Sequence, residues 1–106
     1  MSTLKLWDIH LKYDGPITDE FMDGNRKLAE SIAEEPGVLW KIWTHETGTN
    51  HFGSTYLFKN LEYLETYREM HIKRLNAIGI TDITEHVFDI LEDLSRINHA
   101  PLETKE

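Results

Sequence analysis

Apolar and polar residues alternate along residues 4–13, the first patterned stretch of the chain. Trp7, Ile9 and Leu11 are separated by single polar residues. This period of two is typical of a half-buried strand, whose successive side chains point to opposite faces. The following residues 14–16, Asp-Gly-Pro, end the pattern because Gly and Pro interrupt regular structure.

Two later stretches repeat apolar residues at steps of three and four, which predicts helices. The first begins after Thr18, a suitable N-cap, and ends before Pro36-Gly37. The second runs from about residue 61 to 78, and Gly79 then suits a left-handed residue after the helix. The predicted apolar face of this second helix consists of Leu64, Tyr67, His71, Leu75 and Ile78.

Residues 38–45, 52–58 and 82–91 complete the pattern as three further strands. The resulting order βαββαβ is that of a ferredoxin-like α+β fold. It predicts a four-stranded antiparallel sheet with two helices on one face. We expect one domain over residues 1–106, in which the mixed, polar residues 92–106 form a C-terminal extension.

Large apolar residues occupy both faces of this predicted sheet. Val38, Trp40 and Ile42 are expected on one face of their strand, and Trp43 on the other. Two helices cover one face only, and each large side chain left in water forgoes about 1.5–3 kcal/mol of burial. The simplest cover is a second copy of the sheet, giving a homodimer. The alternative is that residues 92–106 fold over part of this face.

Charge and composition exclude several classes of function. The chain has 19 acidic and 11 basic residues among 106, and its basic residues are scattered, so nucleic acids and anionic membranes are not expected partners. The absence of cysteine excludes disulfides and thiol nucleophiles. No apolar run approaches the ~20 residues of a membrane-spanning helix or resembles a signal peptide at the start. We therefore expect a cytoplasmic protein.

The stretch Glu35–Thr44, EPGVLWKIWT, resembles the hallmark segment of the YdhR-type family of bacterial monooxygenases. Weaker matches follow in the same order over residues 4–100: residues 10–16, 56–58, His71 with Arg74-Leu75, 87–89, 94–95 and 97–98. The chain departs from the family pattern at the hairpin tip, where His45, Glu46 and His51 stand among Thr and Gly.

This resemblance implies a dimeric α+β barrel, in which two ferredoxin-like sheets pack face to face. It also implies a cofactor-independent monooxygenase that oxidises a small aromatic or polyketide-like compound with O₂. Two alternatives stay open: a non-catalytic protein that binds small hydrophobic ligands or serves in a stress response, and a haem-binding or haem-degrading enzyme. In related haem-degrading enzymes a histidine on the second helix ligates iron, and His71 lies on this helix. The Asn and Trp partners of those enzymes are not identified in this sequence, so haem ranks below the aromatic substrate.

Oxygenation without a cofactor requires a base, a hydrogen-bond donor for the substrate anion and a dry pocket with aromatic walls. His71 is the candidate base, because a polar side chain is otherwise out of place on an apolar helix face. Tyr56 and Arg74 are candidate donors to the anion. The alternative for each is structural: a core histidine, a core tyrosine and a surface ion pair.

Trp40, Trp43 and His10 are candidates for binding the substrate. Either indole could stack on a planar ring, but the two point to opposite faces of their strand, so at most one should line a pocket on the helix side. His10 lies on the polar side of the first strand and could be a second acid–base group. Both tryptophans could instead be core residues, and His10 a solvated one.

Two histidines and a carboxylate near the hairpin tip, His45, His51 and Glu46, are of the type that binds zinc or iron, but their spacing matches no known metal motif. The chain has no glycine-rich phosphate loop, nucleophile elbow or dinucleotide fingerprint. We therefore expect no cofactor.

Overall fold

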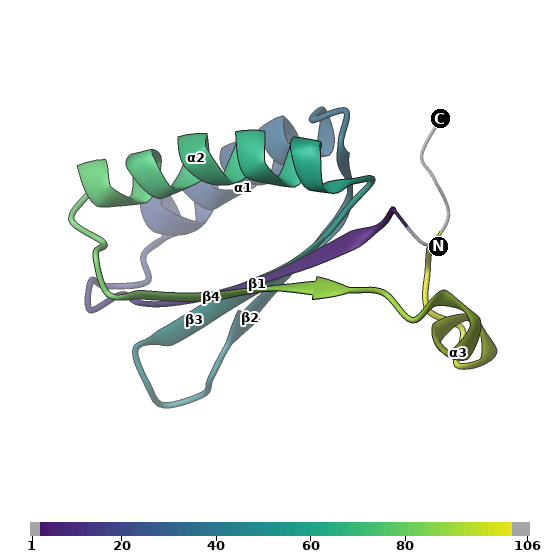
Figure 1. The fold of residues 1–106 in the computed structure, drawn as a ribbon. Coiled ribbons are helices and arrows are strands. Elements are labelled where there is room, and N and C mark those ends of the chain that lie inside the picture. Colours follow the sequence, from purple (N-terminus) through teal and green to yellow (C-terminus); the bar gives the residue numbers. More distant parts are fainter. Residues whose placement is uncertain (1–2, 103–106) are drawn as a thin grey trace.

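A computed structural model describes residues 3–102 of the chain. Its elements in order are β1 (Lys5–Lys12), α1 (Asp19–Ala33), β2 (Val38–His45), β3 (His51–Phe58), α2 (Leu61–Ala77), β4 (Ile83–Asp89) and α3 (Glu92–Ile97). The strands form one antiparallel sheet in the order β2-β3-β1-β4. Figure 1 shows α1 and α2 side by side on one face of this sheet. The predicted ferredoxin-like α+β fold is confirmed.

The ends of the two long helices follow from local chemistry. The Thr18 hydroxyl accepts a hydrogen bond from the backbone N–H of Phe21 at 3.1 Å and so caps α1. The Asn60 side chain caps α2 in the same way by accepting from the N–H of Tyr63 at 3.0 Å. After α2, Gly79 has a φ of 88°, a left-handed conformation that costs glycine little. The predicted cap at Thr18 and left-handed turn at Gly79 are confirmed.

The predicted side-chain phase of β2 is wrong at its start. Val38 lies opposite Phe58 on β3, and Trp40 lies opposite Leu57, so two steps along β2 match one step along β3. This irregularity, a β-bulge, turns Val38 toward the helices, where it is buried, while Trp40 faces the other side. The alternation of residue types alone gives no sign of the extra residue.

The end of the chain contains a helix that the sequence pattern did not predict. Helix α3 is only six residues long and has no side-chain N-cap, so its period is too short to stand out. Beyond it, Leu102 packs in a buried cluster with Leu4 and Leu57 on the sheet face that α1 and α2 leave open. The indole N–H of Trp40 donates to the carbonyl of Pro101 at 2.7 Å. Residues after α3 therefore cover one end of the open face.

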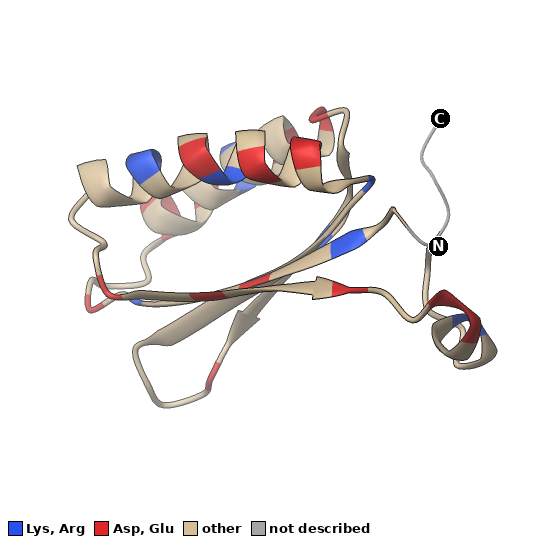
Figure 2. Cartoon of the chain, in the orientation of Figure 1, with Lys and Arg blue, Asp and Glu red and all other residues tan. Residues whose placement is uncertain are grey.

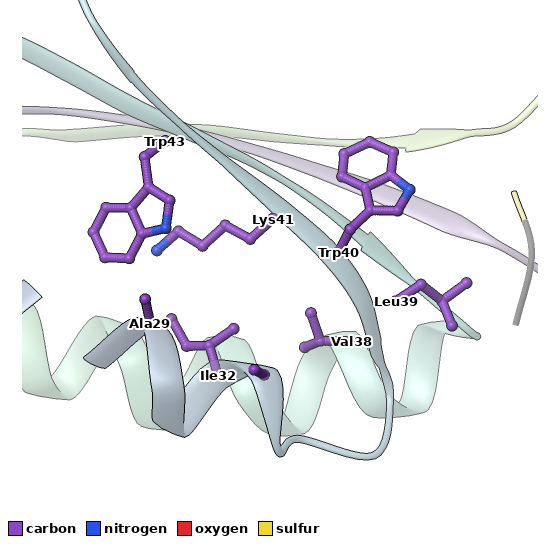
Figure 3. A pocket seen from close by; sticks show the side chains of 8 residues that line it. Ala29, Ile32, Val38, Leu39, Trp40, Lys41 and Trp43 are labelled. Carbon is purple, nitrogen blue, oxygen red and sulfur yellow. The ribbon is translucent and has the colours of Figure 1, made fainter. Parts of the chain in front are cut away.

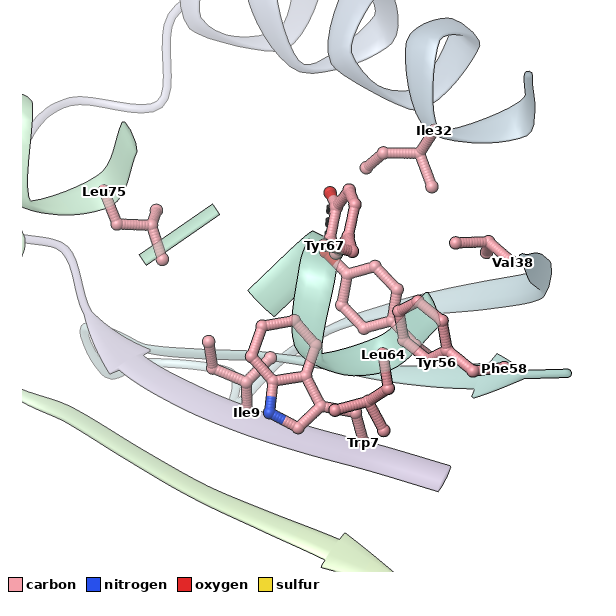
Figure 4. Close-up of a cluster of buried hydrophobic side chains, with 9 residues drawn as sticks. All are labelled: Trp7, Ile9, Ile32, Val38, Tyr56, Phe58, Leu64, Tyr67 and Leu75. Carbon is pink, nitrogen blue, oxygen red and sulfur yellow. Dashed lines mark hydrogen bonds between the residues drawn. The ribbon is translucent and has the colours of Figure 1, made fainter. Parts of the chain in front are cut away.

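The main core lies between the sheet and α1 and α2. Figure 4 shows its nine buried residues, which come from β1, β2, β3 and both helices: Trp7, Ile9, Ile32, Val38, Tyr56, Phe58, Leu64, Tyr67 and Leu75. Four of the five predicted α2 positions are buried. The fifth, Ile78, is 70% exposed, because it is the C-cap of α2 and lies beyond the last turn that packs on the sheet.

Candidate functional site

A pocket of about 240 Å³ opens between α1 and the edge strand β2. Figure 3 shows its walls, made by Ala29, Ile32 and Ala33 of α1 and by Val38, Leu39, Trp40, Lys41 and Trp43 of β2. Pockets for drug-sized ligands usually measure about 300–1,000 Å³. The pocket is therefore suited to a smaller compound of one or two rings.

Both tryptophans of β2 border this pocket. Trp43 lies on the helix-covered face, opposite Ser54 of β3, and is 42% exposed. Trp40 lies on the other face, as predicted, and reaches the rim because β2 is at the edge of the sheet. The two indoles therefore point to opposite faces, as predicted, and both border the pocket because it lies at the edge of the sheet. Trp43 is the indole with an exposed ring on the helix-covered face.

Lys41 is a pocket residue that the sequence analysis did not select. Its Nζ lies 3.5 Å from the ring centroid of Trp43 and 4.6 Å from that of Tyr56. Burial, and secondly the positive charge of Arg74, lower the pKa of Lys41 to about 7. A signal was available in the sequence, since Lys41 has the same strand phase as Trp43 and so points toward the helices.

His71 lies behind the pocket, on α2, and is only 5% exposed. Its Nδ1 is 2.9 Å from Nη2 of Arg74. Because a guanidinium only donates, Nδ1 accepts this hydrogen bond and the ring proton of the neutral imidazole resides on Nε2. Burial, followed by the charges of Lys41 and Arg74, lowers the pKa of His71 to about 3. The imidazole is therefore neutral at physiological pH.

A chain of hydroxyl contacts continues from Arg74 to the sheet. Its Nη2 also donates to the hydroxyl of Tyr67 at 3.2 Å, and the hydroxyls of Tyr67 and Tyr56 lie 3.4 Å apart. Burial raises the pKa of Tyr56 and of Tyr67. The Nε of Arg74 is buried and has no hydrogen-bond partner within residues 3–102. Tyr67, which the sequence analysis treated as a core residue, thus links two of the predicted catalytic residues.

The structure brings together three of the six predicted site residues, His71, Arg74 and Tyr56. A fourth, Trp43, is connected to them through the Lys41 amine, which lies over the rings of both Trp43 and Tyr56. The predicted roles of these residues, as base, anion stabiliser and stacking platform, stay predictions.

His10 belongs to a different group, on the open face of the sheet. Its Nε2 is 2.8 Å from the Asp8 carboxylate, and its Nδ1 is 2.7 Å from Nε2 of His51. His51 in turn contacts the Glu46 carboxylate through Nδ1 at 3.1 Å. His45 points to the opposite face, where its ring stacks on Phe52. Within the described range no three such side chains are placed to hold a metal ion.

Charged residues of both signs are interspersed over α1 and α2, as Figure 2 shows. None of the helices in residues 3–102 has the length and apolar character needed to cross a membrane.

Comparisons with known proteins agree with this fold. The family model described as "Putative mono-oxygenase ydhR" matches residues 6–101. No curated protein matches the sequence.

Three solved structures illustrate the structural likeness. SnoaB, a cofactor-independent oxygenase from Streptomyces nogalater, superposes with a TM-score of 0.66 and 13% identity over 86% of this chain and 96% of its own. A putative antibiotic biosynthesis monooxygenase from Nitrosomonas europaea gives a TM-score of 0.68 at 12% identity, covering 87% and 94% of the two chains. A putative antibiotic biosynthesis monooxygenase from Deinococcus radiodurans gives a TM-score of 0.60 at 18% identity, covering 83% of this chain and 93% of its own. At these identities the likeness shows the fold.

Proposed function

Because the chain belongs to the family described as putative mono-oxygenase ydhR, we propose that it oxidises a small aromatic or polyketide-like compound with O₂ and no cofactor. The observation that carries this proposal is the small pocket between α1 and β2, with the exposed Trp43 ring in its wall and a cluster of polar groups behind it. A planar ring that stacks on Trp43 would lie beside Lys41, and the charge of Arg74 acts on Lys41 from behind the pocket wall.

The proposed reaction acts on a phenol or enol and converts the ring CH₂ group of its keto form into a carbonyl group. One O₂ is consumed, one of its oxygen atoms enters the product, and the other leaves as water with the two hydrogen atoms of the CH₂ group. The substrate supplies the electrons once it has ionised to an enolate or phenolate, so the protein must remove a proton and stabilise an anion.

Arg74 is the proposed stabiliser of the anion, because it is a fixed cation with a buried N–H that has no partner among the described residues. His71 was predicted as the base. Its contact with Arg74 supports a positioning role, since an imidazole that accepts from Nη2 fixes the direction of the guanidinium. Tyr56 lies behind these groups and extends the network through Tyr67. Haem ligation by His71 gains no support, because its ring packs against Trp7 and Tyr67 away from the pocket.

A cytoplasmic homodimer is part of the same proposal. Two side chains of the sheet, Ile42 and Phe88, are about half exposed, and Leu91, Leu94 and Ile97 around α3 are exposed as well. A second copy that packs against this side would remove these apolar groups from water. Sedimentation at micromolar concentration should show a dimer, and a change of Leu94 to Asp should shift the protein toward the monomer.

Oxygen uptake with a panel of hydroxynaphthalenes and two-ring hydroxyquinones tests the activity, with three-ring anthrones as a larger comparison. We expect O₂-dependent turnover by the wild-type protein and incorporation of one ¹⁸O atom into the product from ¹⁸O₂. Ala29→Leu, which fills the pocket, should abolish this turnover. Ala77→Leu, at an exposed position of α2, is the matched control and should retain it.

Two results would count against the proposal. If the wild-type rate equals that of buffer across the panel, the enzymatic assignment fails. If a compound binds tightly, quenches tryptophan fluorescence and is recovered unchanged, the alternative of a ligand-binding protein without turnover is favoured.

A further inference from the structure

Lys41 occupies an unusual position for a lysine. Its side chain runs along the wall of the pocket from the edge strand β2, and Figure 3 shows its amine beside the indole of Trp43. The amine lies over the rings of Trp43 and Tyr56. Within residues 3–102, no carboxylate forms an ion pair or hydrogen bond with it. A half-buried lysine without an acidic partner is uncommon, because its charged form loses hydration that nothing replaces.

The groups around the amine favour its neutral form. Helix α2 contributes the Arg74 cation, the neutral His71 and the hydroxyl of Tyr67. The pKa of Tyr67 is raised, mainly by burial and to a smaller extent by the charge of Glu35. Strand β3 contributes Tyr56, which burial keeps protonated. Helix α1 contributes only Ala29, Ile32 and Ala33 to the pocket wall. Burial and the neighbouring guanidinium together give Lys41 a pKa of about 7, so an appreciable share of the protein carries a free amine at neutral pH.

The same surroundings can also hold the amine once it is protonated. The faces of Trp43 and Tyr56 carry negative electrostatic potential, which attracts an ammonium group through cation–π interaction. A ligand anion in the pocket would add a counter-charge that the protein itself does not provide. Lys41 can therefore exist in both protonation states at the pocket wall, which His71 cannot do near neutral pH.

We propose that Lys41 is the base of the reaction: its neutral amine takes the hydroxyl proton of a one- or two-ring phenol or enol stacked on Trp43, and the resulting ammonium stays beside the anion. The O–H bond of the ligand breaks and an N–H bond forms, so the net charge of the pair is unchanged. This inference rests on the proposed function and names its substrate class as a small phenol or enol. Burial, and secondly the charge of Arg74, favours the neutral amine beforehand, and Arg74 shares the anion afterwards.

A phenol that O₂ does not attack separates this inference from the proposed function. 4-Cyanophenol has one ring, and its phenolate absorbs at longer wavelength than its neutral form. At neutral pH, where the free probe is mostly protonated, we expect the wild-type protein to bind it as the phenolate and to lower its apparent pKa by about one unit or more, a tenfold effect. Lys41→Met should bind it as the neutral phenol. Lys73→Met, at an exposed position on α2, should behave as the wild type.

Lys41→Arg distinguishes a base from a fixed cation. Arginine would attract the phenolate but could not take up its proton, which would pass to the buffer. Calorimetry in two buffers of different ionisation enthalpy should therefore count about one proton released on binding to Lys41→Arg and distinctly fewer on binding to the wild type. Titration of the ¹⁵N-labelled Lys41 amine in the wild-type protein follows its protonation directly. We expect a partly neutral amine without ligand and a protonated amine when the probe is bound.

The inference is overturned by any of three results: the wild-type protein binds the probe as the neutral phenol or not at all, Lys41→Met binds the same fraction of phenolate, or Lys41→Arg releases no more protons than the wild type. These outcomes do not depend on O₂ uptake, so failure of the oxygenase activity would be seen separately.

Discussion

The two helices cover the same face of the sheet in different ways. Under α2 the space is filled by large rings from β1, β3 and the helix itself, and Trp7, Tyr56 and Phe58 are fully buried there. Under α1 two of the three residues that face β2 are alanines, and a pocket remains. The difference lies in side-chain size: Tyr67 reaches the sheet from α2, whereas Ala29 and Ala33 do not reach it from α1.

This contrast separates structural from chemical roles. The ring cluster under α2 holds His71 neutral and fixes Arg74, and its rings Trp7, Tyr56 and Phe58 are fully buried. The pocket under α1 has room and an exposed indole, and it meets the polar cluster at Lys41. The α2 side is therefore expected to control stability, and the α1 side binding.

The largest expected effect comes from emptying the ring cluster. Trp7→Ala removes a fully buried indole that also donates to Glu85 at 2.9 Å, and it should lower the free energy of unfolding by about 3–5 kcal/mol. Trp43→Ala, the matched change in the pocket, removes a ring that is already partly in water and should cost about 1 kcal/mol. Urea denaturation followed by circular dichroism measures both. Equal losses would contradict the contrast between the two sides.

The fall in the free energy of unfolding below pH 6.5 tests the burial of His71. In the unfolded chain this histidine takes up a proton near its ordinary pKa of 6.5, whereas in the folded protein it does so only near 3. Between these values the unfolded state binds more protons, so stability is full above pH 6.5 and falls as the pH drops, by up to about 1.4 kcal/mol per unit from this group. His71→Phe should remove this contribution. An unchanged slope in that variant would show that His71 is not its source.

Overpacking distinguishes a filled region from an open one. Leu64→Phe adds volume to the packed cluster under α2 and should cost about 1–3 kcal/mol. Ala29→Leu adds volume where the pocket provides space, so it should change the free energy of unfolding by less than about 1 kcal/mol and weaken binding of 4-cyanophenol at least about tenfold. If Ala29→Leu destabilises as strongly as Leu64→Phe, the pocket is not open in solution.

The smallest effect is a gain in stability. The unfolded chain keeps the Lys41 proton up to the ordinary pKa of 10.5, but the folded protein releases it near 7. Between these values the unfolded state binds more protons, so the lysine's contribution to stability is lost as pH falls from 10.5 to 7. Lys41→Met should therefore raise the free energy of unfolding at neutral pH, by on the order of 1 kcal/mol, while phenolate binding is lost. A loss of stability would indicate that the ammonium is well accommodated.

The sequence was sufficient to predict most of the fold, because periodicity and capping act locally. The strand alternation around Trp7 and Ile9, the Thr18 cap and the turn at Gly79 depend only on near neighbours. Two features were missed, one because it depends on a distant partner and the other because it is short. The bulge at Val38 is defined by the register with β3, and α3 is too short to show a period.

The candidate site was less predictable for the same reason. His71, Arg74 and Tyr56 were selected from residue type and helix or strand phase, and they do lie together. His10 was selected by the same means, but register places it with Asp8 and His51 on the other face. Lys41 was missed because a strand lysine is usually solvated, and its burial results from the approach of α1 and α2.

Ligands are expected to enter under α1 rather than under α2, and nuclear magnetic resonance can locate a bound ligand directly. With 4-cyanophenol added to the wild-type protein, we expect the largest chemical-shift changes at the Trp43 indole N–H and at the Ala29 and Ala33 methyl groups, with smaller changes at His71. Large chemical-shift changes at Tyr67 and His71, with the α1 methyl groups unaffected, would contradict entry under α1.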